Sequence, residues 1–139
     1  MSDTSTARAI SSSWRWEPIK SPLRASWHVD LPPSDVAKVA HGVVPLMMED
    51  RWFCFAEDPD AEGVFRFHLC RSWTGNEIAT LTIRAALDAA GTLDPAARAT
   101  VTEIAWEEDA STQDRGEADA KETAADVCRG LMDCEFKVQ

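Results

Sequence analysis

The sequence has no tyrosine, no long apolar run and far fewer basic than acidic residues. A helix that crosses a bilayer needs about 20 consecutive apolar residues, and no segment approaches that length. The first ten residues also lack the apolar centre of a secretory signal peptide. We therefore expect a cytoplasmic protein that does not enter a membrane.

The charge balance narrows the classes of partner. The 139 residues contain 14 bases and 24 acids, which gives a formal net charge of −10. Such a charge disfavours bulk binding to nucleic acid or to anionic lipid. The length and an apolar content of 45% fit one globular domain. We expect a Ser/Thr-rich flexible tail over residues 1–13 and a single domain over 14–139.

The four cysteines show no metal-binding or disulfide pattern. Their spacings include no CxxC, and neither HxxxH nor HExxH occurs in the chain. In a reducing compartment such cysteines are expected to be free thiols, and we assign no metal site. The common phosphate-binding and hydrolase signatures are also missing, so no catalytic residue or cofactor can be named.

Hydrophobic periodicity predicts an α+β fold. Apolar residues alternate as in half-buried strands over residues 25–31, 51–56, 64–73, 77–84 and 99–106. Helical spacing is present over residues 34–44 and 117–134. Together these segments predict an antiparallel β-meander of about four to five strands with two helices packed on one face.

The period of two also assigns side chains to the two faces of the sheet. The large apolar side chains are expected under the helices: Phe53, Phe55, Phe65, Phe67, Leu69, Leu81 and Ile83. The opposite face would then carry Trp52, Cys54, Arg66, His68, Cys70, Ser72, Ile78, Thr80, Thr82 and Arg84.

A three-residue hairpin loop at 74–76 would set the register between two central strands. It pairs Trp73 with Glu77 next to the loop and Leu69 with Leu81 farther along. The same register places Arg66 directly across from Arg84. Like charges in such a pair are destabilising, and a bound anion would relieve the repulsion. We therefore expect a ligand-binding surface made of Trp52, Arg66, His68, Arg71, Ser72, Thr74 and Arg84.

Other interpretations of the same residues remain open. The face can be solvated, covered by the acidic C-terminal region, or buried in a homodimer. The acids Glu49, Asp50, Glu57 and Asp58 bracket one strand, where acid–base catalysis, magnesium binding or plain solvation are all compatible with the sequence.

The segment 49–78 resembles a motif of small, uncharacterised bacterial proteins. The resemblance rests on Trp52-Phe53, Glu57-Asp58, His68 and the block from Arg71 to Gly75, which follow a W-F, ED, H-R-S-W-T-G pattern. This chain departs from the pattern by placing Leu69-Cys70 between the histidine and the arginine. The resemblance implies no known activity, only that these positions act together.

These features lead to two hypotheses of function. The first is a small binding or regulatory module that recognises an anionic small molecule or an acidic protein segment on the Trp/Arg-lined face. The alternative is a small enzyme acting on a nucleotide or an ADP-ribose-like substrate.

Overall fold

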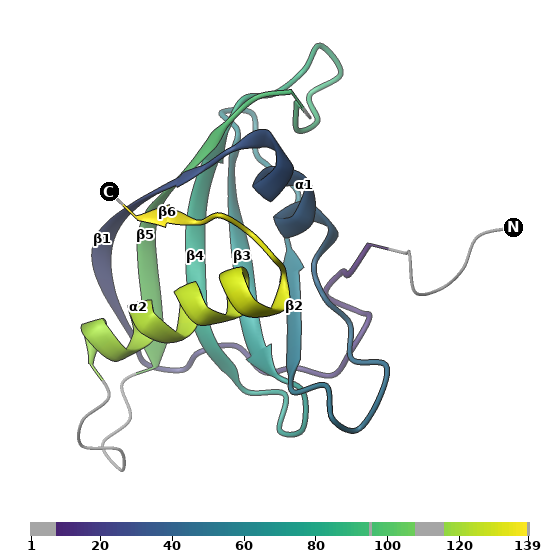
Figure 1. Ribbon diagram of the computed structural model, residues 1–139, viewed down its shortest axis with the longest axis vertical. Coiled ribbons are helices and arrows are strands. Elements are labelled where there is room, and N and C mark those ends of the chain that lie inside the picture. The colour runs from purple at the N-terminus through teal and green to yellow at the C-terminus, as the bar shows by residue number, and fades with distance from the viewer. Residues whose placement is uncertain (1–7, 95, 108–115, 139) are drawn as a thin grey trace, which may run out of the picture.

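The structure is a computed structural model that describes residues 8–94, 96–107 and 116–138. Its elements are, in chain order, β1 (Pro22–Leu31), α1 (Pro33–His41), β2 (Trp52–Ala56), β3 (Val64–Arg71), β4 (Glu77–Ala85), β5 (Ala99–Glu107), α2 (Glu117–Asp126), a π-helical turn (Val127–Leu131) and β6 (Lys137–Val138). Figure 1 shows α2 lying across one face of a curved sheet.

The six strands form one antiparallel sheet in the order β2-β3-β4-β5-β1-β6. The four consecutive strands from β2 to β5 form the expected meander. The first strand, β1, returns to pair with β5, and the two-residue β6 pairs with β1. The α+β class is therefore confirmed, and β6 is a strand that the periodicity did not predict because it is only two residues long.

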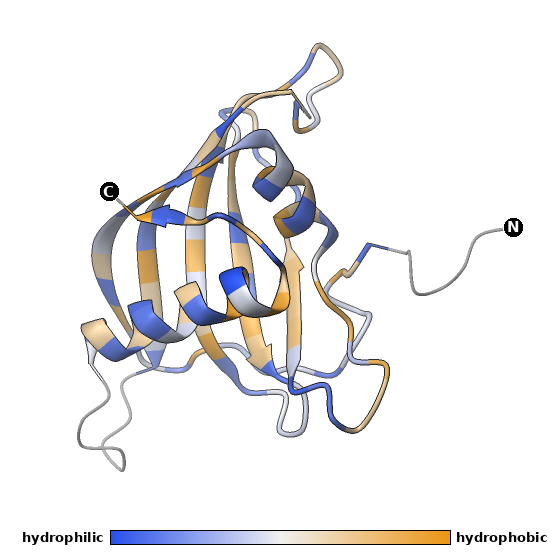
Figure 2. Ribbon diagram, viewed as in Figure 1, coloured by the Kyte–Doolittle hydropathy of each residue, from blue (hydrophilic) through white to orange (hydrophobic). Residues whose placement is uncertain are grey.

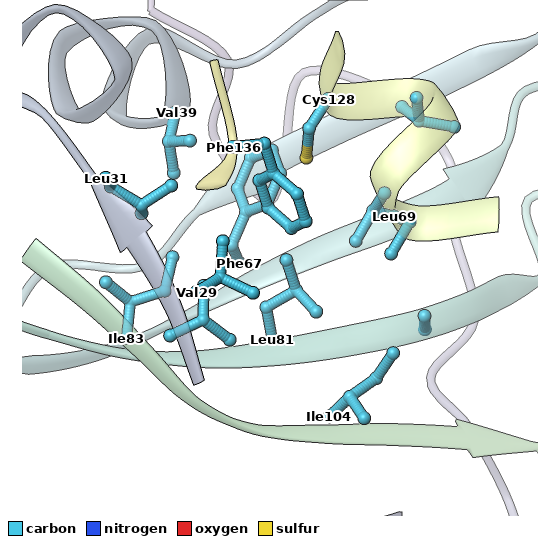
Figure 3. Close-up of a cluster of buried hydrophobic side chains, with 14 of the residues drawn as sticks. Val29, Leu31, Val39, Phe67, Leu69, Leu81, Ile83, Ile104, Cys128 and Phe136 are labelled. Carbon is cyan, nitrogen blue, oxygen red and sulfur yellow. The ribbon is translucent and has the colours of Figure 1, made fainter. Parts of the chain in front are cut away.

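The main core lies between the sheet and the helices. Phe67, Leu81 and Ile104 project toward α2 from neighbouring strands, and Phe136 of the C-terminal segment packs among them (Figure 3). Figure 2 shows the alternation of apolar and polar residues along these strands that produces one buried face. Burial of each such side chain contributes about 1.5–3 kcal/mol.

The second helix ends earlier than its periodicity predicts. Regular α-helix stops at Asp126, and a π-helical turn follows, closed by a hydrogen bond from the Met132 amide to the carbonyl of Val127. The Cys134 amide still bonds to the carbonyl of Cys128, with Asp133 at φ of 59° between them. Beyond that point, the amides of Glu135 and Phe136 donate to the buried carboxylate of Asp35 at 2.9 and 2.8 Å.

The predicted assignment of the β2 side chains to the two faces of the sheet is wrong. Cys54, which we expected on the polar face, lies in the main core, while Phe53 and Phe55 lie on the opposite face of the sheet. There they form a second buried cluster with Ala9 and Cys70, and Trp16 packs against it. The N-terminal segment covers this side of the sheet, so β2 is buried on both sides and carries apolar side chains on both faces. Alternation alone therefore cannot show which face of β2 points toward the helices.

The expected register between β3 and β4 is also wrong. The last pair before the turn is Cys70 with Glu77, so the turn is longer than the expected three residues, and an irregularity lies between Leu69 and Cys70. Arg66 consequently lies opposite Thr82, and Arg84 lies opposite Val64. The direct pairing of two arginines, on which the electrostatic argument for an anion depended, does not exist.

The N-terminal segment is packed where the structure describes it. The Ala9 amide donates to the carbonyl of His41, and Ala9 itself is buried, so this part of the expected flexible tail is attached to the domain. Farther along, Glu17 exchanges backbone hydrogen bonds with the 75–77 segment. Gly75 has φ of +77°, and a Cβ there would lie 2.8 Å from the Arg15 carbonyl, so glycine permits this close approach.

Two sequence expectations concern the whole chain. All four cysteines are buried and free, in agreement with the expectation of free thiols. Across the described ranges, no helix is both long and apolar enough to cross a membrane.

Candidate functional site

A polar hollow of about 420 Å³ opens on the sheet face opposite α2. Its floor comes from four strands, and one wall comes from the N-terminal segment. It is lined by Pro18, Ile19, Pro22, Arg24, Arg66, His68, Glu77, Thr80, Thr82, Glu103 and Ala105. A hollow of this size can hold a small molecule.

The sheet register explains why the surface is concave here. One cross-strand row runs from His68 through Thr80 and Ala105 to Arg24. The next row runs from Arg66 through Thr82 to Glu103. Small side chains therefore occupy the middle of the floor, and long charged side chains stand around them.

The most buried charged group of this hollow is Glu77. Its Oε2 lies 2.5 Å from Nδ1 of His68 and accepts a hydrogen bond of 2.5 Å from the Thr80 hydroxyl. Its Oε1 accepts a 3.3 Å bond from the Ile19 amide. A buried carboxylate is stable only when such donors surround it. Glu77 thus ties β3, β4 and the N-terminal segment together.

His68 lies between two carboxylates. Its Nε2 is 2.5 Å from Oε2 of Glu57, whose side chain is about half exposed, so both ring nitrogens face an acceptor. Burial alone would lower the pKa of His68, but hydrogen bonds and charge from Glu77, and then from Glu57, raise it above its ordinary value. Both ring N–H groups donate only in the imidazolium form.

Two aromatic rings enclose this imidazolium. Phe55 stacks on His68 with ring centroids 4.7 Å apart, and Trp16 lies at 5.1 Å. Aromatic faces favour a cation, which adds to the effect of the carboxylates. His68 is therefore held within the protein, with neither ring nitrogen available to a ligand.

The remaining charges of the hollow are unequally paired. Arg24 lies 3.9 Å from Glu103, and both side chains are about half exposed, so this ion pair is weak. Arg66 is exposed, and no carboxylate among residues 8–94, 96–107 and 116–138 forms an ion pair with it. The guanidinium of Arg66 is thus the free cation of the site.

The structure brings together only two of the seven residues expected to bind a ligand. Arg66 and His68 line the hollow. Arg84 lies on the same face of the sheet but does not line the hollow. Its guanidinium is 3.9 Å from the carboxylate of Glu62. Trp52 packs against the main core on the other face, with the guanidinium of its cross-strand partner Arg71 at 4.3 Å from its ring.

Ser72 and Thr74 serve the turn between β3 and β4. Ser72 is buried, and its hydroxyl donates to the carbonyl of Asp50 at 2.7 Å. The Thr74 hydroxyl accepts the Asn76 amide at 3.1 Å. These contacts hold the turn in shape, and they lie away from the polar hollow.

Sequence reasoning missed Glu77, Thr80 and Arg24 as members of the site. Glu77 was assigned only to the start of a strand, because the expected register placed it opposite Trp73. One signal was present: His68 stands within an otherwise apolar strand, and a buried histidine requires hydrogen-bond partners. The acids near it in sequence, Glu57 and Glu77, are those partners.

The comparisons with known proteins found no matching protein-family model, no matching curated protein and no matching solved structure.

Chemically, the site offers a free guanidinium, a threonine-lined floor and a carboxylate–imidazolium–carboxylate chain. Within the part of the chain that the structure describes, no three His, Cys, Asp or Glu side chains are arranged to hold a metal ion.

Proposed function

We propose that this protein is a small binding module that recognises an anionic group of a small ligand in the polar hollow. The observation that carries the proposal is the exposed guanidinium of Arg66. It borders a hollow in which the other cations, Arg24 and His68, already have carboxylate neighbours. A guanidinium binds carboxylate or phosphate through two parallel hydrogen bonds.

The floor is suited to a ligand that lies across the strands. Strands β3 and β1 are three steps apart in the sheet, which corresponds to roughly 14 Å. Arg66 and Arg24 stand at the two sides of that span, and the Thr82 side chain lies between them in the floor. An anionic group on Arg66 would leave the rest of the ligand over Thr80, Thr82 and Ala105.

The histidine and its carboxylates contribute to this function indirectly. Glu77 holds the Ile19 amide, and Ile19 is part of the wall formed by the N-terminal segment. Because His68 and Thr80 also bond to Glu77, the wall and the floor are fixed relative to one another. A site fixed before binding loses less entropy when a ligand enters.

One observation favours an enzyme as the second candidate. The imidazolium of His68 can release its Nδ1 proton to the buried Glu77 and take it back, while its Nε2 proton stays in the hydrogen bond to the half-exposed Glu57. The substrate of such an enzyme would be a nucleotide or an ADP-ribose-like molecule bound by Arg66. Chromatography of AMP and ADP-ribose after incubation with the protein tests this candidate. Turnover that disappears in Glu57→Gln supports it, and no turnover leaves the binding proposal as stated.

A thermal-shift panel tests the binding proposal. The panel consists of phosphate, pyrophosphate, AMP and citrate. At least one of these anions should raise the Tm of the parent protein by mass action. Arg66→Gln should lose that rise, while Arg84→Gln, on the same face but outside the hollow, should keep it. Added salt should weaken the effect because exposed charges are screened.

The proposal fails if no anion of the panel raises the Tm, or if Arg66→Gln responds as the parent does. An acidic protein segment and a second copy of the chain are the other occupants to consider. Sedimentation of the parent across a range of protein concentrations identifies the second copy, because only a dimer shows a concentration-dependent mass.

A further inference from the structure

A second hollow is lined by an earlier part of the N-terminal segment and shares no residue with the polar one. Its volume is about 960 Å³, and its lining is mainly apolar. The lining residues of the hollow, hereafter the tryptophan groove, are Trp14, Arg15, Pro45, Leu46, Met47, Met48, Asp50, Ser72 and Trp73.

The apolar side chains of the tryptophan groove are unusually exposed. Leu46 is 66% exposed, Trp73 is 68% exposed and Met48 is 84% exposed. Large apolar side chains gathered at one exposed hollow are typical of binding surfaces rather than of plain solvated loops. Trp, Met and Arg are also the residue types enriched in protein interfaces.

Hydrogen bonds hold the two indole rings in place. The Nε1 of Trp14 donates to the carbonyl of Ser72 at 2.8 Å, and the Nε1 of Trp73 donates to the carbonyl of Met48 at 3.0 Å. Each ring therefore has its polar atom satisfied inside the protein. Its apolar surface remains free for an occupant, with little conformational entropy left to lose.

The loop that carries the methionines is also fixed. The Asp50 carboxylate accepts the amides of Leu46 and Met47 at 2.8 and 3.1 Å, and the Asp50 amide donates to the Met47 carbonyl at 3.0 Å. The backbone of the loop is thereby set, while the methionine side chains can still adapt to different shapes.

Charge complementarity indicates the chemistry of the occupant. Asp50 and Arg15 are the two charged residues of the lining. The carboxylate of Asp50 is engaged by two amides of its own loop. Arg15 is exposed, and no carboxylate in the described part of the chain forms an ion pair with it. The groove therefore offers apolar surface beside one available positive charge.

We infer that the tryptophan groove binds a short segment of a partner protein that presents apolar side chains next to an acidic residue. The apolar side chains enter between Trp14 and Trp73, and the acidic residue meets Arg15. Met48 is the most exposed of the apolar lining residues at 84%, so an occupant has to extend to the outer edge of the groove to cover it. A polypeptide covers the hollow and the rim together.

Selection from a random dodecapeptide phage library against the full chain tests this inference. Enriched peptides should combine two or more large apolar residues with Asp or Glu. Synthetic copies should bind at least tenfold more weakly to Trp73→Ala. They should also bind more weakly to Arg15→Glu, and replacing their acidic residue with Lys should weaken binding to the parent. Arg66→Gln should bind them as the parent does, which separates this groove from the polar hollow.

Several outcomes would overturn the inference. These are no enriched sequence, enriched sequences that are polar or basic, or equal affinity for the parent and for Trp73→Ala. As a control, the circular dichroism spectrum of each variant should match that of the parent, which shows that the variant is folded. Concentration-dependent dimerisation that Trp73→Ala abolishes would assign the groove to a second copy instead. Co-sedimentation of the protein with phosphatidylcholine vesicles would assign the tryptophan groove to a lipid surface.

Discussion

His68 and Glu77 form a buried ion pair across the β3–β4 hairpin, with Nδ1 and Oε2 2.5 Å apart. Glu77 was expected opposite Trp73, but the longer turn places it opposite Cys70, where its carboxylate reaches the histidine. The same carboxylate holds the Ile19 amide, so this pair links the sheet to the N-terminal segment. The stability of the domain should therefore depend on the charge of one histidine.

The first prediction concerns pH. Because the folded state raises the pKa of His68, its contribution to stability is fully present below the unfolded pKa near 6.5 and is lost as pH rises through the folded pKa. The difference in unfolding free energy between the parent and His68→Asn should therefore shrink as the pH is raised from about 6 to about 9. Denaturant melts at the two pH values measure it.

The control for that experiment is His28→Asn. His28 is an exposed residue of β1 that forms no ion pair among the described residues. Its replacement should leave the pH dependence of the parent intact. A constant difference between the parent and His68→Asn at both pH values would contradict the assignment of an imidazolium between Glu57 and Glu77.

The second prediction concerns Asp35, which is fully buried in α1. Its carboxylate accepts the amides of Glu135 and Phe136 and so anchors the C-terminal segment. Asp35→Ala would leave one buried and one partly buried amide without an acceptor and should cost about 2–4 kcal/mol of stability by chemical melt. Asp58→Ala removes an exposed ion pair with Arg8 and should cost less than about 1 kcal/mol. Equal costs would contradict the anchoring role.

The third prediction tests the two faces of the sheet. Phe67 lies in the main core, and Phe53 lies in the cluster under the N-terminal segment. Because both side chains are fully buried, each change to Ala should cost about 3–5 kcal/mol. A cost near zero for Phe53→Ala would show that the N-terminal segment does not seal that face in solution.

The fourth prediction concerns the thiols. Burial raises the pKa of Cys54 to about 12 and that of Cys134 to about 12, and it also raises the pKa of Cys70 and Cys128. Only the thiolate reacts quickly with a disulfide reagent. Native protein at about pH 8 should therefore react slowly, and unfolded, unreduced protein should release four equivalents. Rapid reaction of the native protein would mean that a cysteine is accessible.

The sequence predicted the strands and helices well because hydrophobic periodicity is a local property. Residues such as Phe67 and Leu81 were correctly expected to be buried. The register and the face of β2 were wrong for non-local reasons. The longer turn forms backbone hydrogen bonds with the distant Glu17, and the second apolar face depends on the distant Trp16 and Ala9.

The candidate site was predictable only in part for the same reason. Arg66 and His68 stand out in a strand whose other face is apolar, so their shared face could be predicted. Their neighbours Thr82 and Glu77 follow from the register, which was wrong by two residues. Arg24 comes from β1, which reaches the site through a pairing with β5 that the strand pattern did not indicate.

The central claim is that Arg66 binds an anion over the threonine-lined floor. The most direct measurement is a set of NMR titrations of the full chain with phosphate, pyrophosphate, AMP and citrate. For at least one of these anions, the account predicts saturable amide shifts centred on Arg66, Thr80 and Thr82, which disappear in Arg66→Gln and persist in Arg84→Gln. The absence of saturable shifts, or shifts that Arg66→Gln retains, would contradict it.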